Sequence, residues 1–523
     1  MSFASRRFLL ILLVALLSIS VISVAFVYNS TSEVSQYYSS TSGVEYYNST
    51  SEVEYYELKH ECTMVVVGKN ATTDGSIIIS RTEDWYGNWA KHLIVVPRMQ
   101  HKANTTICSV YTGFCYPLPP VTYKYIAIPD WDWIEYPGRP LPGAVYDAAG
   151  INEVFVAVTA TVTIYPSKKV AELDPFVDNG IAEDLITTII LATTKSAREA
   201  VRLVGYLVET FGAAEGMVIA VADPNEVWII EVLSGRHWVA VRVPDDSYVV
   251  YGNEMRICEV NLADTENYMG SADLIEFAVK NGLWDPTTGE PFCVAKAYGP
   301  PPHPRNYRRV WGIARLFSPS ANYDPEQKYY PYFMKPDRPL SIKDVMIAHR
   351  EFYAGTPYDT RYNPAERGVG ISRTQEAHII QVRGWLPVEI GGVMWIAMSA
   401  PRASIYVPFY AGITKVPYTY SIGTDKYDDE SAFWTFRTIA NILFLDPVKY
   451  EPFIRNYLDR YENLTISIQP YIEQYALTLY NVDKELAIEF LNKYCEITAI
   501  GAQKFARQLF AELMTKLARE LRS

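Results

Sequence analysis

The sequence predicts an α+β fold, in which antiparallel strands and helices occupy separate stretches of the chain. Two apolar, β-branched runs at residues 64–67 and 77–79 flank a Gly/Asn/Asp-rich segment, which is the pattern of a hairpin. Three further β-rich runs between residues 217 and 244 are separated by the turn sequences DPNE and SGR. Residues 428–523 instead have helical periodicity. With 523 residues, 49% hydrophobic and 20% charged, the chain can bury a large core.

The first 27 residues have the composition of an export signal. Arg6 and Arg7 precede an apolar run at residues 8–27 that only serines interrupt. A run of about twenty residues is also long enough for a membrane-spanning helix. We therefore expect residues 1–27 to be a signal peptide or a membrane anchor, with anchoring through residues 8–27 left open. Either form places the rest of the chain outside the cell or on its surface.

Residues 28–61 form a different kind of segment. The sequence YNSTSEV begins at Tyr28 and again at Tyr47, within a tract rich in Ser, Thr, Tyr and Glu. Such a tract has too few aliphatic residues to fold alone. We predict a solvated spacer or propeptide over residues 28–61.

Residues 62–84, CTMVVVGKNATTDGSIIISRTED, contain three chemically active groups at fixed spacing. If the two apolar runs pair as an antiparallel hairpin, the turn centres near Ala71 and Thr72, and Cys62 lies opposite Arg81. A thiol, a guanidinium and the carboxylate of Asp84 would then meet at one end of a sheet. This segment is a candidate catalytic cluster.

Farther along the first half of the chain, helices and strands alternate. Residues 117–142 contain too many prolines for a helix or a central strand, and we expect surface loops there. Residues 148–163 predict a turn followed by a strand. Residues 181–211 predict two helices, the second capped by Ser196. The runs at residues 217–244 predict an antiparallel meander.

In the second half, short helices are expected at residues 271–280 and 341–353, and strands return at residues 370–417. His378 lies in an alternating strand, where a structural role is favoured. Residues 298–309 form a proline-rich loop with a basic end, in which Arg308 or Arg309 either binds a substrate carboxylate or is simply solvated. From residue 428 on, we expect helices broken at Pro447, Pro452 and Pro470.

The six cysteines lack the CxxC spacing of a zinc or redox site. A turn containing Gly113 separates Cys108 from Cys115, so these two are the favoured disulfide, with unpaired packing cysteines as the alternative. If Cys62 is a free nucleophile, five cysteines remain. At most two disulfides can then form, and one thiol is left.

Several classes of function are disfavoured. The formal charge of −12 and the absence of Lys/Arg clusters argue against a nucleic-acid partner. No HExxH, Walker loop or GxGxxG is present, and the seven histidines are scattered, so we expect neither a metal nor a nucleotide cofactor. GxSxG is absent as well, which disfavours a serine hydrolase.

The pattern Cys-Thr, Gly-Lys, Thr-x-Asp-Gly-Ser and Arg-x-x-Asp resembles the opening of the C69 dipeptidases, relatives of the penicillin V acylases and bile salt hydrolases. Gly-Ile-Asn-Glu at residues 150–153, the tryptophan-containing meander at residues 226–257 and residues 370–417 also resemble segments of that family. The likeness covers residues 62–417 in several islands.

This resemblance implies the four-layer αββα sandwich of N-terminal nucleophile hydrolases over residues 62–425, with a helical region at residues 426–523 packed on it. It implies an exported dipeptidase whose mature chain begins with the nucleophile and whose substrate is a small peptide. In those relatives an arginine lies beside the thiol, an aspartate orients the α-amine and two asparagines form the oxyanion hole. The corresponding residues here are Cys62, Arg81, Asp84, Asn152 and Asn253.

One condition follows from this chemistry: the Glu61–Cys62 bond must be broken, because an amide nitrogen cannot act as the base. Self-cleavage and trimming by another protease both stay open. An acylase acting on other linear amides, such as N-acyl amino acids, is an alternative within the class. A non-catalytic cell-surface binding protein on the same fold is an alternative outside it. Homo-oligomerisation also stays open.

Overall fold

The computed structural model describes residues 62–129, 146–162 and 164–522. The expected signal or anchor, the spacer and part of the expected loop at residues 117–142 lie outside the described residues. Within the described part of the chain, no helix combines the length and the apolar character needed to cross a membrane.

A six-stranded antiparallel sheet contains the hairpin that the sequence predicts. The order across this sheet is β14 (Tyr248–Tyr251), β1 (Thr63–Val67), β2 (Ile77–Asp84), β16 (Thr374–Val382), β17 (Gly392–Met398) and β18 (Val407–Tyr410). Its two innermost strands are β2 and β16, so the end of β2 is supported on both sides. The strands expected at residues 370–417 are therefore confirmed.

A second, eight-stranded antiparallel sheet contains the predicted meander as β11 to β13. Its order is β15 (Tyr268–Gly270), β13 (Trp238–Arg242), β12 (Val227–Val232), β11 (Met217–Ala222), β10 (Ala157–Val162), β9 (Asp147–Asn152), β8 (Tyr125–Pro129) and β3 (Ile94–Val96). Two expectations are corrected here. Residues 125–129 form a buried strand and not a surface loop, and residues 148–152 belong to a strand, with the turn after Asn152.

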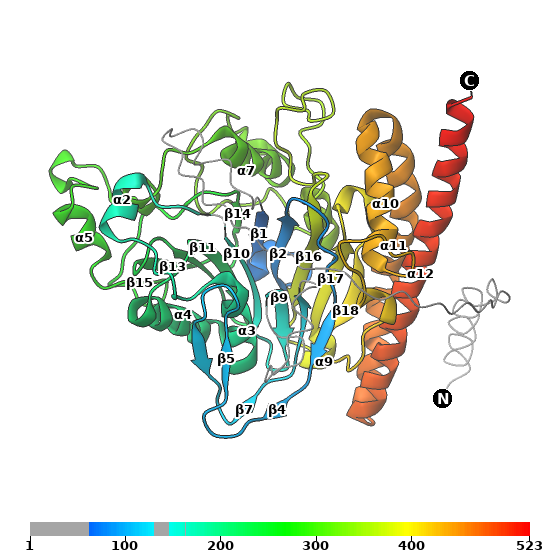
Figure 1. Cartoon of the computed structure of the whole chain (residues 1–523), viewed down its shortest axis with the longest axis horizontal. Coiled ribbons are helices and arrows are strands. Elements are labelled where there is room, and N and C mark those ends of the chain that lie inside the picture. The colour runs from blue at the N-terminus through cyan, green and yellow to red at the C-terminus, as the bar shows by residue number, and fades with distance from the viewer. Residues whose placement is uncertain (1–61, 130–145, 163, 523) are drawn as a thin grey trace, which may run out of the picture. The chain divides into compact units, whose positions relative to one another are not determined.

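The two sheets pack face to face, with β2 against β10 and β11 and with β9 against β16 and β17 (Figure 1). Alternate residues of β11 show both of its buried faces. Val218, Ala220 and Ala222 belong to the large core shared with the six-stranded sheet, whereas Met217, Ile219 and Val221 belong to a second core with helices. Burial on both faces explains why this strand is apolar throughout instead of alternating.

The second core lies between the eight-stranded sheet and helices α3 (Glu183–Thr193) and α4 (Ala197–Phe211), which contact β9 to β13. The two predicted helices and their junction are confirmed. The Ser196 hydroxyl accepts a hydrogen bond from the Glu199 amide at 3.1 Å, as expected for an N-cap.

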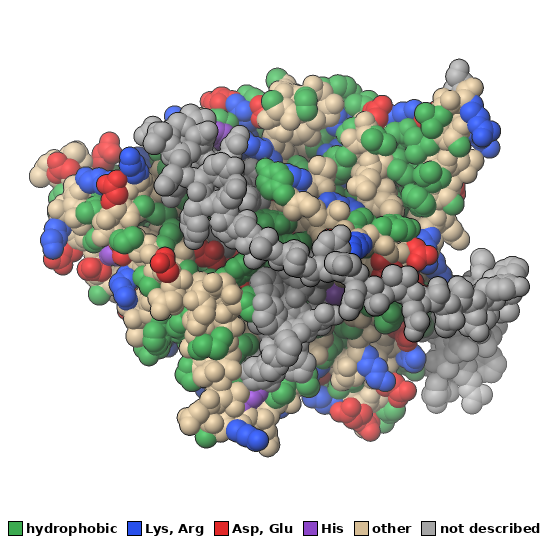
Figure 2. All heavy atoms as spheres, viewed as in Figure 1, with side chains coloured by type: hydrophobic (Ala, Val, Ile, Leu, Met, Phe, Trp, Pro, Cys, Tyr) green, Lys and Arg blue, Asp and Glu red, His purple; other side chains and the backbone are tan. Residues whose placement is uncertain are grey.

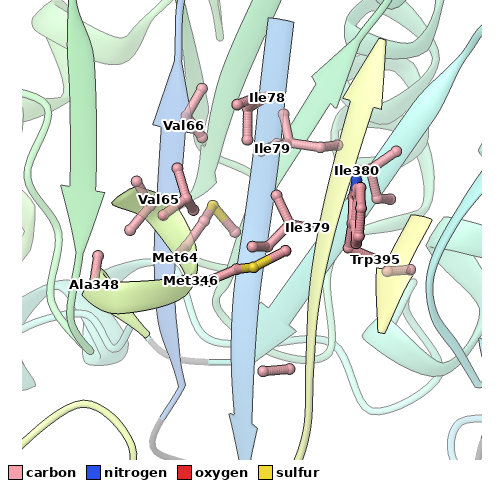
Figure 3. Close-up of a cluster of buried hydrophobic side chains, with 14 of the residues drawn as sticks. Met64, Val65, Val66, Ile78, Ile79, Met346, Ala348, Ile379, Ile380 and Trp395 are labelled. Atoms are coloured by element: carbon pink, nitrogen blue, oxygen red, sulfur yellow. The ribbon is translucent and has the colours of Figure 1, made fainter. Parts of the chain in front are cut away.

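Other helices contact the opposite face of the six-stranded sheet. Figure 3 shows Met346 and Ala348 of α8 (Ile342–Ala348) near Met64 and Val65 of β1 and Ile379 of β16. Ser341 begins α8 with a capping box to Asp344. The remaining helices are α2 (Lys168–Leu173), α5 (Leu274–Lys280), α6 (Val294–Tyr298), α7 (Pro304–Phe317), α8 (Ile342–Ala348) and α9 (Val388–Gly391).

Five short 3₁₀ helices and two small hairpins complete the described elements. The hairpins pair β4 (Met99–Gln100) with β7 (Val121–Thr122) and β5 (Thr106–Cys108) with β6 (Cys115–Pro117). The 3₁₀ helices are η2 (Lys69–Ala71), η4 (Pro286–Thr288), η5 (Pro319–Ala321), η6 (Pro401–Ala403) and η7 (Tyr418–Tyr420).

The C-terminal region is helical, as expected, and consists of α10 (Ala432–Leu445), α11 (Pro447–Tyr480) and α12 (Lys484–Glu520). α10 contacts β17, and α12 contacts β18 (Figure 1). Pro447 begins α11, where its missing N–H costs nothing. The breaks predicted at Pro452 and Pro470 are wrong, because α11 continues through both prolines. Packing against α12 and the sheet domain outweighs the lost hydrogen bonds.

Three buried carboxylates attach α11 to the rest of the protein. Glu451, Glu462 and Glu473 follow one another at three-turn spacing, so they lie on one face of the helix. Glu451 binds Arg402 with both oxygens, at 2.7 and 2.6 Å. Glu462 binds Arg350 at 3.0 and 2.6 Å, and Glu473 binds Arg383 at 2.6 Å.

The predicted Cys108–Cys115 disulfide is present, and a second disulfide joins Cys258 to Cys293. Cys62 and Cys495 are free and buried. The six cysteines therefore form two disulfides and leave two free thiols, Cys62 and Cys495, which agrees with the expected maximum of two disulfides.

On the face drawn in Figure 2, Lys and Arg side chains are interspersed with Asp and Glu among the described residues. This distribution gives no continuous basic surface on that face for binding phosphates.

Candidate active site

The β1–β2 hairpin brings Cys62 to one end of the six-stranded sheet, with a small correction to the expected register. Thr63 pairs with Thr82 and Met64 with Arg81, so the position opposite Cys62 is that of Glu83 and not Arg81. The 3₁₀ turn η2 makes the connection asymmetric and moves its centre by one residue. Arg81 is then the diagonal neighbour of Cys62 on the same face, which a long side chain can span.

Arg81 reaches the thiol from this diagonal position. Its Nη1 lies 3.7 Å from Cys62 Sγ, and Cys62 is 3% exposed. Burial raises the pKa of the Cys62 thiol to about 11, while the charge of Arg81 acts to lower it. In the uncleaved chain the thiol is therefore neutral at pH 7. A base and the cation together are needed to form the thiolate.

Two carboxylates, one from strand β2 and one from helix α3, position the Arg81 guanidinium. Glu83 of β2 lies 2.7 Å from Nη2, and Glu183, the first residue of α3, lies 3.3 Å from Nη1. Glu83 also pairs with Lys91 at 2.5 Å. Burial favours the neutral carboxyl, but the charges of Lys91 and Arg81 lower the pKa of Glu83. Arg81 is thereby fixed between the two sheets with its charge balanced.

Asp84 ends β2 and is buried against the start of β16. Its carboxylate accepts hydrogen bonds from the Thr374 hydroxyl and from Arg367 Nη2. Burial raises the pKa of Asp84, although Arg367 and Thr374 act in the opposite direction. The negative charge of Asp84 acts to raise the pKa of the Cys62 thiol.

Arg309 connects Cys62 to Asn253, a link that the sequence analysis missed. Its Nη1 donates to the Cys62 carbonyl at 2.6 Å and to Thr63 Oγ1 at 2.9 Å. Its Nη2 donates to the side-chain carbonyl oxygens of Asn253 and Asn306, the latter at 2.9 Å. This arginine therefore links the main chain of Cys62 to the side chain of Asn253.

The structure does not give Asn152 a free amide hydrogen. Asn152 Nδ2 donates to the carbonyls of Leu191 and Thr194, both at 3.0 Å. Its Oδ1 accepts from the amides of Val154 and Val156. These bonds shape the β9–β10 turn and attach it to α3. The contacts are those of a structural asparagine, in contrast to the oxyanion role that the resemblance implied.

One signal in the sequence could have pointed to the role of Arg309. Arg309 lies on the apolar face of α7 with Val310 and Ile313, where a charged residue needs a buried partner. The expected loop at residues 298–309 was wrong in its second half, because α7 begins at Pro304 behind the His303 cap. Arg308 instead pairs with Glu326 and Glu366. Glu183 and Arg367 carry no comparable signal, since only tertiary packing brings them to the site.

His378 is fully buried on β16. Its Nδ1 lies 2.9 Å from Glu376 Oε1, and its Nε2 lies 3.0 Å from Thr159 Oγ1. Its contacts are those of the structural histidine that the sequence analysis favoured. Among residues 62–129, 146–162 and 164–522, no group of three or more His, Cys, Asp or Glu could hold a metal ion.

Taken together, the described contacts place a thiol beside a fixed cation, with its main-chain carbonyl bound by a second cation and a carboxylate nearby. Such a site suits nucleophilic attack on an amide carbonyl, with thiolate formation favoured by Arg81.

Comparison with known proteins shows the family of this chain. A probable dipeptidase of Latilactobacillus sakei is 33% identical over 471 residues, which cover 87% of this chain and 95% of that protein. A probable dipeptidase of Salmonella dublin is 38% identical over 375 residues, or 70% of this chain and 83% of that protein. A probable dipeptidase B of Streptococcus pyogenes serotype M1 is 32% identical over 423 residues, or 78% and 82%. The model of peptidase family C69 matches residues 61–460. The chain belongs to peptidase family C69.

Proposed function

We propose that this protein is an exported dipeptidase in which cleavage of the Glu61–Cys62 bond makes Cys62 an N-terminal nucleophile. The observation that carries the proposal is the free, buried Cys62 thiol 3.7 Å from Arg81, at the first residue before β1. The family match begins one residue before Cys62, and the relatives named above are called probable dipeptidases. These names favour dipeptides over other linear amides as substrates.

Cleavage supplies the missing base. A free α-amine has a reference pKa of roughly 7.7 to 8.0, so its neutral form can take the thiol proton near neutral pH. The thiolate Sγ attacks the carbonyl carbon of the dipeptide, and a tetrahedral oxyanion forms. When the C–N bond breaks, the α-ammonium returns its proton to the leaving amine, and a thioester remains. Water then attacks the thioester, releases the acyl residue as a carboxylic acid and regenerates the thiol.

The surrounding groups have distinct parts in this scheme. Arg81 stabilises the thiolate, and Asp84 orients the α-amine. Arg309 binds the Cys62 carbonyl and the Asn253 side-chain oxygen, and in this scheme the Asn253 amide group serves as an oxyanion donor. Loss of one such donor costs about 3 kcal/mol in comparable sites. We leave Asn152 out of the scheme because its amide hydrogens already have partners.

Two further parts of the proposal concern fold and location. The two facing antiparallel sheets, with α3 and α4 against one and α8, α10 and α12 against the other, support the four-layer sandwich of N-terminal nucleophile hydrolases. The Cys108–Cys115 and Cys258–Cys293 disulfides support export, since disulfides persist in oxidising compartments.

The test is hydrolysis of Ala-Ala by the purified protein and by two single-cysteine variants. Cys62→Ala is expected to abolish hydrolysis. Cys495→Ala removes the other free buried thiol, in α12, and is expected to keep the rate. Retained hydrolysis in Cys62→Ala would refute the proposal.

A further inference from the structure

We infer that an aromatic surface formed by Trp85, Trp89, Tyr146 and Tyr111 takes an aromatic or large aliphatic side chain of the substrate, so that the enzyme prefers dipeptides carrying one. The inference rests on the proposed function, which fixes Cys62 as the reacting centre. None of these four residues is used in the scheme above.

The four rings contact one another in sequence. Trp85 stacks on Trp89 with ring centroids 4.8 Å apart and planes at 19°. Trp89 meets Tyr146 edge to face at 6.1 Å, and Tyr111 meets Tyr146 in the same way at 6.3 Å. Tyr146, in the middle of the row, is 6% exposed, whereas the two tryptophans on one side of it are half-buried and Tyr111 on the other side is 59% exposed. The surface therefore has a buried centre and more exposed flanks.

The buried ring at the centre of this surface, Tyr146, is linked to the reacting centre. The Tyr146 hydroxyl donates to Glu183 Oε2 at 3.3 Å. The other oxygen of Glu183 lies 3.3 Å from Arg81, whose guanidinium is 3.7 Å from the Cys62 thiol. A dipeptide backbone spans about 7 Å. A large side chain on a dipeptide whose carbonyl meets the thiol would therefore extend the substrate beyond its backbone toward Tyr146.

Tyr146 is fixed in an unfavourable backbone conformation. Its φ is 61°, in the left-handed region that few residues other than glycine adopt. The Lys91 ammonium lies 5.6 Å from the centre of its ring. Strain of this kind persists where the surroundings enforce it and is concentrated at binding and catalytic sites.

Hydrogen bonds from α10 and β16 hold the segment that carries Trp85 and Trp89. Arg437 of α10 donates to the Gly87 carbonyl at 3.0 Å, to Asn88 Oδ1 at 3.1 Å and to the Ser372 carbonyl at 2.7 Å. Gln375 accepts from the Trp89 amide at 2.9 Å and donates to the Trp85 carbonyl at 2.9 Å. These bonds make the segment after Asp84 a rigid platform, which suits recognition of an apolar side chain by shape.

Aromatic faces favour apolar and aromatic partners, and each aromatic contact improves binding beyond simple burial. The substrate class that this surface selects is therefore a dipeptide with Phe, Tyr, Trp, Leu or Met beside the scissile bond.

The experiment measures kcat/KM of the mature protein for Ala-Ala, Phe-Ala and Ala-Phe. Wild type is expected to prefer one of the two phenylalanine substrates over Ala-Ala by about tenfold or more. Trp89→Ala should remove most of that preference, chiefly through KM, and should change Ala-Ala hydrolysis by less than about threefold. Tyr111→Ala, at an exposed position that tolerates substitution, provides a second variant.

Trp385→Ala is the matched control. Trp385 is 56% exposed and lies near Gly75, at the opposite end of the hairpin from Asp84. It should leave the preference intact. An equal loss on all three substrates in Trp89→Ala, or no preference in wild type, would overturn the inference and leave the proposed function standing. If wild type hydrolysed none of the three, the proposed function itself would fall.

Discussion

Glu462 is one of the three buried carboxylates that attach α11 to the rest of the protein. It is fully buried on α11 and binds Arg350 Nη1 and Nη2 at 3.0 and 2.6 Å. Lys343 lies 2.7 Å from the same carboxylate, and the Tyr406 amide donates to it at 3.1 Å. Burial alone would raise the pKa of Glu462, but the charge of Arg350, with Lys343 and Arg455, holds it far below its usual range.

The perturbation is Glu462→Gln, which keeps the shape of the side chain and removes its charge. The buried guanidinium of Arg350 then loses its nearer counter-ion and is left with Asp459 at 4.0 Å. Breaking a buried pair from one side costs about 3 to 5 kcal/mol, because the remaining charge stays in a low-dielectric environment. We expect the free energy of unfolding at pH 7 to fall by about that amount, measured by urea denaturation.

The effect should depend on pH in a defined direction. The pKa of Glu462 is depressed in the folded protein, against about 4.3 for an unperturbed glutamate. Its stabilising contribution is therefore complete above the unfolded value and is lost as pH falls toward the folded one. The stability difference between wild type and Glu462→Gln should be largest above pH 5 and should narrow below about pH 4.

Asp246→Asn is the control, since Asp246 forms an ion pair with Lys335 at the surface. It is expected to have little effect, as exposed pairs usually do. A Glu462→Gln protein as stable as wild type at pH 7 would refute the reasoning.

Three further predictions concern the site. Replacing Arg81 by Gln should raise the pKa of the mature Cys62 thiol. The Coulomb energy of the pair is roughly 4 kcal/mol at an effective dielectric constant of about 20, which limits the rise to about 3 pH units. An unchanged pH profile of iodoacetamide alkylation would contradict this. Arg309→Lys cannot bridge the Cys62 carbonyl and Asn253 at once, so kcat should fall by about 100-fold with KM less affected, and a normal kcat would count against the bridge. Asn152→Ala should lower the free energy of unfolding by about 2 to 4 kcal/mol with kcat of the folded enzyme nearly unchanged, whereas normal stability with lost kcat would restore an oxyanion role.

The parts of the fold that local chemistry determines were predictable from the sequence. The hairpin of β1 and β2, the Ser196 cap and the meander of β11 to β13 each depend on residues close together in the chain. The predicted register placed Cys62 opposite Arg81, whereas the structure places it opposite Glu83, two positions along β2. Because successive side chains of a strand alternate between the two faces, this difference of two positions leaves Cys62 and Arg81 on the same face.

The parts that depend on tertiary packing were not predictable in this way. Pro452 and Pro470 predict breaks by local rules, but α12 and the sheet domain hold α11 as one helix. Arg309 of α7 contacts Cys62 from 247 residues away in the sequence. Glu183 of α3 contacts Arg81 from 102 residues away. The likeness at residues 150–153 pointed to Asn152, but the contacts of its side chain with α3 could be seen only in the folded protein.

The most direct test of the account is the N-terminal sequence and intact mass of the purified protein, measured beside Cys62→Ala. We predict that the active chain begins at Cys62 and that its mass lacks residues 1–61. A fully active protein that retains residues 28–61 would contradict the account, since Cys62 would then have no α-amine to act as its base.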